Sequence, residues 1–219
     1  MELKGLKANF LGDSITAGVG TSSPEHIFLN VIKTECGLAE ARNYGISGTR
    51  IARQTECAAA GNNDDCNYCA RVAEMDPDAD LIVVFGGTND FGHGNAPFGE
   101  ETDRTRDTFI GACHELFSSL LNKYPAATIV VMTPTHRWNE DASYGDWRTN
   151  QPMILSEYVK VIKDVAAKYS LPVFDAYAMG GIQPLIPGQK EIYMPDGLHP
   201  SDAGNARIAQ RLIGFLRTL

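Results

Sequence analysis

Residues 7–14 read KANFLGDS, a short apolar run that ends in glycine, aspartate and serine. The run from Lys7 to Leu11 is typical of a buried strand, and Gly12 permits a turn that bulkier residues resist. Ser14 is then expected at the carboxyl edge of a sheet, where α/β folds bind their ligands. Two interpretations of Ser14 stay open at this point: a nucleophile, or a turn residue bonded to its own backbone.

Beyond this stretch, short β-rich runs alternate with longer helical patterns, which is typical of a parallel sheet covered by helices. Strands are predicted over residues 7–11, 41–46, 81–85, 128–132 and 172–175. Helices are predicted over residues 24–36, 50–60, 69–75, 109–123, 154–169 and 201–216. The last three of these show apolar residues at helical spacing.

Two long stretches, residues 91–103 and 134–150, show no regular pattern. Each follows a predicted strand, so both are expected beside Ser14 at the carboxyl edge of the sheet. Loops of this length are more often functional than idle. The sequence contains no repeat, linker or low-complexity segment, and 219 residues suffice for one substantial core. We therefore expect a single domain over residues 1–219.

The composition argues against several classes of partner. A formal net charge of -8 repels phosphate backbones and anionic membranes, so we expect neither nucleic acid nor a membrane as partner. The longest apolar runs, such as residues 81–85, are too short to span a bilayer. Residues 1–5 hold no apolar stretch of signal-peptide length, which predicts a cytoplasmic protein, although a secreted form whose signal had been removed would read the same.

The five cysteines are Cys36, Cys57, Cys66, Cys69 and Cys113. Cys66 and Cys69 have the spacing of zinc ligands and Cys57 is near, but a fourth ligand is missing. A zinc site, a local disulfide and reduced thiols all stay open for these three, and reduced thiols are favoured. Cys36 and Cys113 fall on apolar faces of predicted helices and are expected in the core.

A nucleophilic serine needs a base and a group that orients that base. His199 lies in the motif DGLHP, residues 196–200, just before the last predicted helix. Asp196 can fold back within one turn and accept a bond from Nδ1, which leaves Nε2 for the serine proton. The alternative is a helix-capping Asp196 with a buried loop histidine. His114 falls inside an amphipathic helix and is predicted to lie on its surface.

A developing oxyanion needs hydrogen-bond donors. Asn89 lies in GGTND, residues 86–90, directly after the clearest strand, and its neutral amide would be a good donor. Gly48, which follows the second strand, can present a bare backbone N–H, and the N–H of Ser14 would be a third donor. Each also has a plain alternative, an Asx-turn for Asn89 and a loop glycine for Gly48.

Four motifs follow one another along the chain, and all are expected at one edge of the sheet. They are a serine after the first strand, a glycine after the second, an asparagine after the third and Asp-x-x-His before the last helix. At this point the sequence resembles the SGNH, or GDSL-type, hydrolase family. The matching pieces are GDSIT at 12–16, SG at 47–48, GTND at 87–90 and DGLHP at 196–200. Ile15 replaces the leucine of the family nickname and is expected to face the packing side. A Gly-x-Ser-x-Gly elbow is missing around Ser14, so the common α/β-hydrolase fold does not fit.

The resemblance implies an esterase or acylhydrolase on a flavodoxin-like, three-layer α/β/α fold with about five parallel strands. Ser14 would be the nucleophile, His199 the general base and then acid, and Asp196 its orienting partner. Ser14, Gly48 and Asn89 would form the oxyanion hole. Neither a cofactor nor a metal is implied.

For the substrate, the polar character of both long loops favours a small-acyl ester, such as an acetyl group on a polar or carbohydrate alcohol. The polar residues include His93, His136 and Arg137. Rings that could stack on a sugar are supplied by Trp138, Tyr144 and Trp147. The same loops could instead be solvated chain with partly buried aromatics. The other functions that stay open are a lipid or thioester acylhydrolase and a non-catalytic carbohydrate-binding module on the same fold.

Overall fold

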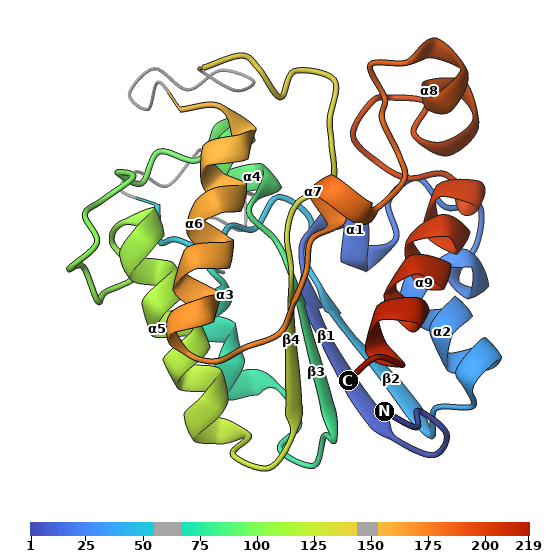
Figure 1. Ribbon diagram of the computed structural model, residues 1–219, viewed down its shortest axis with the longest axis horizontal. Helices are drawn as coiled ribbons and strands as arrows, with labels where there is room; N and C mark the ends of the chain where they lie inside the picture. Colours follow the sequence, from blue (N-terminus) through green and yellow to red (C-terminus); the bar gives the residue numbers. More distant parts are fainter. Residues whose placement is uncertain (55–66, 144–152) are drawn as a thin grey trace.

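The computed structural model describes residues 1–54, 67–143 and 153–219. At its centre is a parallel sheet of five strands in the order β2-β1-β3-β4-β5 (Figure 1). The strands are β1 (Lys7–Gly12), β2 (Glu40–Gly45), β3 (Leu81–Phe85), β4 (Thr128–Met132) and β5 (Val173–Phe174). This is the strand order of flavodoxin-like folds, so the predicted fold class is confirmed. The predicted bounds of β3 and β4 are correct to the residue.

Helices cover both faces of the sheet (Figure 1). On one face lie α2 (Phe28–Cys36) and α9 (Asp202–Leu216). The other face is covered by α3 (Tyr68–Arg71), α5 (Phe109–Lys123) and α6 (Leu155–Lys168). The shorter helices α1 (Ser14–Ala17), α4 (Thr88–His93), α7 (Ala176–Met179) and α8 (Pro187–Tyr193) lie near the upper ends of the strands in Figure 1. The structure therefore has three layers, as predicted.

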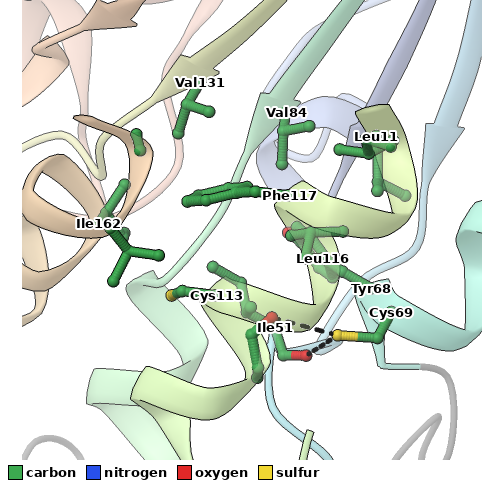
Figure 2. Packing of buried hydrophobic residues seen from close by; sticks show 14 of the residues in the cluster. Leu11, Ile51, Tyr68, Cys69, Val84, Cys113, Leu116, Phe117, Val131 and Ile162 are labelled. Atoms are coloured by element: carbon green, nitrogen blue, oxygen red, sulfur yellow. Dashed lines mark hydrogen bonds between the residues drawn. The ribbon is translucent and has the colours of Figure 1, made fainter. Parts of the chain in front are cut away.

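The two faces of the sheet form two separate cores, because successive side chains of a strand point in opposite directions. In β3, Val83 belongs to the core with α2 and α9, whereas Ile82 and Val84 belong to the core with α5 and α6. Figure 2 shows the second core, with Phe117 of α5 close to Val84 and Val131. Strands covered on both faces read as continuous apolar runs, which is why β3 and β4 were clear in the sequence. By contrast, β2 is a polar, half-buried edge strand.

Several helix predictions were wrong in detail. The predicted helix over 24–36 breaks at Ile27, whose extended backbone separates a 3-10 turn (Pro24–His26) from α2. The segment over 69–75 is likewise divided between α3 and a 3-10 turn (Val72–Glu74). Residues 50–54 are not helical, and residues 55–66 lie outside the described residues. Residues 91–93 were expected to be irregular but form the last turn of α4, and α7 and α8 were not predicted.

His114 was predicted on a helix surface, and this was wrong. It is 2% exposed, because α5 packs against α6, and its Nδ1 lies 3.0 Å from the Tyr169 hydroxyl. Desolvation by burial lowers the pKa of His114. The ring is therefore part of the packing between α5 and the end of α6.

Cys69 is a free, buried thiol. Its sulfur lies 3.4 Å from the carbonyl oxygen of Ala112 and 3.7 Å from that of Ile51 (Figure 2), and burial raises its pKa. Cys113 is buried and Cys36 half-buried, and both are free. Cys57 and Cys66, the other two members of the predicted cluster, lie outside the described residues. Within residues 1–54, 67–143 and 153–219, no group of three His, Cys, Asp or Glu side chains could hold a metal ion, and no helix is long and apolar enough to cross a membrane.

Candidate active site

Ser14 lies where β1 passes into α1. Gly12 ends the strand, and a Cβ at that position would lie 1.9 Å from Thr16 Oγ1, so only glycine lets the helix begin this close to the strand. The Asp13 carboxylate accepts a hydrogen bond from the N–H of Ile15 at 2.9 Å and so caps the helix. Burial raises the pKa of Asp13 to about 6. The local sequence thus holds Ser14 as the first residue of a capped helix at the sheet edge.

The hydroxyl of Ser14 faces His199, which comes from the loop between α8 and α9. Ser14 Oγ lies 3.1 Å from His199 Nε2, and His199 Nδ1 lies 2.7 Å from Asp196 Oδ2. The other oxygen of Asp196 accepts hydrogen bonds from the backbone N–H of Leu198 at 2.8 Å and of His199 at 2.7 Å. One turn of chain therefore holds the carboxylate against the imidazole, and the structure brings Ser14, His199 and Asp196 together.

These bonds determine where the protons lie. Burial opposes the charge of Asp196, but the bonds donated by the backbone N–H groups of His199 and Leu198 and by the His199 ring lower its pKa. The ionised carboxylate can only accept, so His199 carries its proton on Nδ1. Nε2 then offers a lone pair to the Ser14 hydroxyl. Chemically, this arrangement can remove a proton from Ser14.

The strand order brings the other two predicted residues to the same edge. Strand β1 lies between β2 and β3, so the chain after β1 lies between the chains that follow its two neighbours. Gly48 turns the chain after β2 with a φ of 79°, a conformation that favours glycine. Asn89, in the first turn of α4, is 4% exposed, and its Nδ2 donates to the carbonyl oxygen of Thr49 at 3.0 Å. Asn89 thus contacts the Gly48 turn directly.

Two buried charged residues support this edge and were missed in the sequence. Arg71 is 4% exposed and donates from Nη1 to Thr49 Oγ1 at 3.0 Å and to the carbonyl oxygen of Gly12 at 3.2 Å. Asp90 accepts from the backbone N–H groups of Ile51 and Ala52, both at 3.0 Å. No sequence pattern pointed to Arg71, which lies outside the four motifs. Asp90 could have been found, because it is the last residue of the GTND motif.

Comparison with known proteins agrees with this geometry. The sequence matches the GDSL-like lipase/acylhydrolase family over residues 10–207. The chain belongs to this family. The resemblance inferred from the four motifs is thereby confirmed.

Three similar proteins illustrate the relationship. An acetylxylan esterase of Xylanibacter ruminicola is 25% identical in an alignment of 189 residues that covers 80% of this chain. The chain spans only 35% of the length of that curated relative. The crystal structure of a protein from Lactobacillus plantarum is 29% identical, with a TM-score of 0.82 and 98% of each chain covered. A carbohydrate acetylesterase family member from Sinorhizobium meliloti is 18% identical, with a TM-score of 0.64 over 97% of this chain and 98% of that one, and shows the fold alone.

The polar loop after β4 of this GDSL-family chain is only partly solvated. Arg137 is 1% exposed and donates to the carbonyl oxygen of Thr88 at 3.0 Å, so it is a buried support rather than a surface residue. In the same loop, His136 Nδ1 lies 2.7 Å from Glu140 Oε2. Tyr144 and Trp147 lie outside the described residues.

Trp138 is an exposed aromatic residue of that loop, at 52% exposure, and it lies beside the loop that bears His199. Its backbone N–H donates to the carbonyl oxygen of Gly197 at 2.9 Å, and a Cβ on Gly197 would lie 2.7 Å from Trp138 Cβ. An exposed ring therefore contacts the chain between Asp196 and His199.

Proposed function

We propose that this chain is a serine esterase. Its Ser14 Oγ attacks the carbonyl carbon of an ester while His199 Nε2 takes the hydroxyl proton. The proton then passes to the departing alcohol oxygen as the ester C–O bond breaks, which leaves an acyl group on Ser14. Water attacks that acyl group with His199 again as base, and the acid and the free serine are released. The observation that carries this proposal is the unbroken line of hydrogen bonds from Asp196 through His199 to Ser14.

In this mechanism the negative charge on the carbonyl oxygen is stabilised by the N–H groups of Ser14 and Gly48 and by the Asn89 amide. Support comes from the placement of Ser14 between the chains that bear the other two residues, and from the contact of Asn89 with Thr49. Fixed donors of this kind stabilise a developing charge more strongly than water does, because they need no reorganisation.

For the substrate, we propose a small acyl group, such as acetyl, on a polar or carbohydrate alcohol. The exposed ring of Trp138 beside the His199 loop supports a sugar, since aromatic faces pack on sugar rings, and the related acetylxylan esterase acts on such an ester by name. A lipid acylhydrolase is the second candidate. It is favoured by the exposed apolar side chains of Leu185, Ile186 and Ile192 in and around α8, the helix that precedes the His199 loop.

The test is a comparison of wild type with Ser14→Ala on nitrophenyl esters from acetate to decanoate and on acetylated xylo-oligosaccharides. We expect the highest kcat/KM on acetyl esters and a fall of at least about 10⁴-fold in kcat for Ser14→Ala, because triad members act as a unit. Equal rates for the two proteins would contradict the serine mechanism, and a preference for long chains would favour the lipid alternative. A second assay after exhaustive chelation tests for metal dependence. Thermal unfolding of both proteins controls for loss of fold.

A further inference from the structure

Behind Asn89 lies a pair of side chains, the half-buried His93 and the buried Arg50, that the mechanism above does not use. His93 is four residues after Asn89 on α4, so the two side chains share one helix face. His93 Nε2 lies 3.1 Å from Asn89 Oδ1. On the other side of the ring, Arg50 Nη2 lies 2.5 Å from His93 Nδ1 and 3.3 Å from the His93 carbonyl oxygen. Arg50 is 8% exposed and comes from the chain after the Gly48 turn.

The chemistry of these three groups allows one arrangement of protons. A guanidinium can only donate, so His93 Nδ1 accepts from Arg50. A neutral imidazole with Nδ1 accepting carries its hydrogen on Nε2, and that hydrogen is donated to Asn89 Oδ1. The Asn89 amide is then oriented with its oxygen toward His93 and its nitrogen away from it.

The nitrogen of the Asn89 amide requires the same orientation as the oxygen. Asn89 lies 3.0 Å from the carbonyl oxygen of Thr49, which can only accept, so Nδ2 must face it. An amide nitrogen has two hydrogens, and Thr49 takes one of them. The rotation of an asparagine amide about χ2 is otherwise broad, and a flipped amide would present an oxygen to the reacting carbonyl. Two independent contacts thus select the orientation in which the second hydrogen can be donated.

We propose that His93 and Arg50 are positioning residues that hold the Asn89 amide with Nδ2 toward the ester carbonyl. This inference rests on the proposed role of Asn89 in the oxyanion hole. His93 acts only through Asn89 and does not touch the substrate, so its effect falls on the transition state, in which the oxyanion carries charge, and little on substrate binding.

The experiment is a double-mutant cycle on an acetyl ester with wild type, His93→Ala, Asn89→Ala and the double variant. We expect His93→Ala to lower kcat roughly 10-fold with KM changed less than about threefold, a smaller loss than the roughly 10²- to 10³-fold of a deleted oxyanion donor. In the Asn89→Ala background, His93→Ala should change kcat less than about twofold, because the residue it positions is gone. His93→Gln, whose amide can donate to Asn89 Oδ1, should recover most of the activity.

The outcomes separate this inference from the function on which it rests. If Asn89→Ala leaves kcat unchanged, the oxyanion role of Asn89 is wrong, whatever His93 does. If Asn89→Ala lowers kcat but His93→Ala is silent, or lowers kcat equally in both backgrounds, only the positioning role is wrong. Should His93→Ala fail to fold, His93→Gln and His93→Leu replace it, and equal kcat values for these two would overturn the proposal. The matched control is His26→Ala, an exposed histidine bonded to Ser22 and expected to leave kcat unchanged.

Discussion

The two sides of Ser14 are built differently. On the proposed oxyanion side, which comprises Gly48, Thr49 and Asn89, the supporting groups are buried and belong to distant parts of the chain. On the base loop, residues 194–200, the Asp196 side chain is 55% exposed and is held by its own neighbours. The difference matches the two tasks that we propose for these sides, because a charge is stabilised best by fixed donors shielded from water, whereas proton transfer needs access for alcohol and water.

The largest effect is expected on the base loop, from Asp196→Asn. The backbone N–H groups of Leu198 and His199 donate to Oδ1, so the amide oxygen must occupy that place and the NH₂ group must face His199 Nδ1. Nδ1 would then accept, Nε2 would carry the proton, and Ser14 would have no base. We expect kcat to fall about 10⁴-fold, as for the wrong imidazole tautomer in other triads.

Asp196→Ala is the comparison for that variant. Because the position is more than half exposed, water can accept the proton of Nδ1 and keep the correct tautomer. We expect a smaller loss of kcat than for Asp196→Asn. A larger loss for alanine than for asparagine would show that the tautomer argument is wrong.

The next largest effect is expected on the oxyanion side, from Asn89→Ala. Deletion of one oxyanion donor should lower kcat roughly 10²- to 10³-fold with little change in KM. Steady-state kinetics on nitrophenyl acetate measures both constants. An unchanged kcat would remove Asn89 from the oxyanion hole and make the oxyanion side a purely structural region.

The electrostatic contrast between the two sides can be measured as stability against pH. Burial raises the pKa of Asp90 to about 6 in the folded protein, against about 3.9 in an unfolded chain. Between these pH values the folded state holds a proton that the unfolded state has released, so this contribution to stability is present below about pH 4 and lost as pH rises through 6. Asp90→Asn removes it, so wild type should gain about 2 kcal/mol relative to the variant on going from pH 7.5 to pH 4.5.

Urea denaturation of both proteins at the two pH values tests this expectation, since contributions of other carboxylates are common to both. Asp196 supplies the matched control, because its pKa is lowered in the folded state. Its contribution is present above the unfolded pKa and is lost only as pH falls through the still lower folded pKa, so the difference in stability between wild type and Asp196→Ala should change little between pH 7.5 and pH 4.5. If the difference in free energy of unfolding between wild type and Asp90→Asn does not change with pH, the groups on the oxyanion side are not shielded from water as described above.

The smallest effect is expected from Trp138→Ala, which removes the ring beside the base loop. Loss of one stacking contact of about 0.5–1.5 kcal/mol corresponds to a rise in KM of about 2- to 10-fold on acetylated xylo-oligosaccharides. We expect kcat to be unchanged, and Trp138→Phe to retain most of the affinity. Similar KM values for wild type and Trp138→Ala on these oligosaccharides, measured beside nitrophenyl acetate as the sugar-free substrate, would argue against a sugar-binding role.

Sequence reasoning succeeded where the determining interactions are local. The strands β3 and β4 were clear because both of their faces are buried, and Asp196 reaches His199 within one turn. Residues 50–54 were predicted as a helix because their composition permits one, but the backbone N–H groups of Ile51 and Ala52 bind the Asp90 carboxylate instead. That competition depends on a residue 39 positions away, which a local pattern does not contain.

The sequence by itself determined the parallel sheet, the turn at Gly12 that presents Ser14, and the short motifs that indicate the family, because each depends on residues within a few positions of one another. Only the tertiary structure decided which buried side chains contact and support those motifs. Arg50 reaches His93 across 43 positions and Arg71 reaches Gly12 across 59, and both are buried polar contacts that exist only once the strands are assembled side by side. A charged residue reads as surface in a sequence, and its burial becomes visible only with the partners that offset its desolvation.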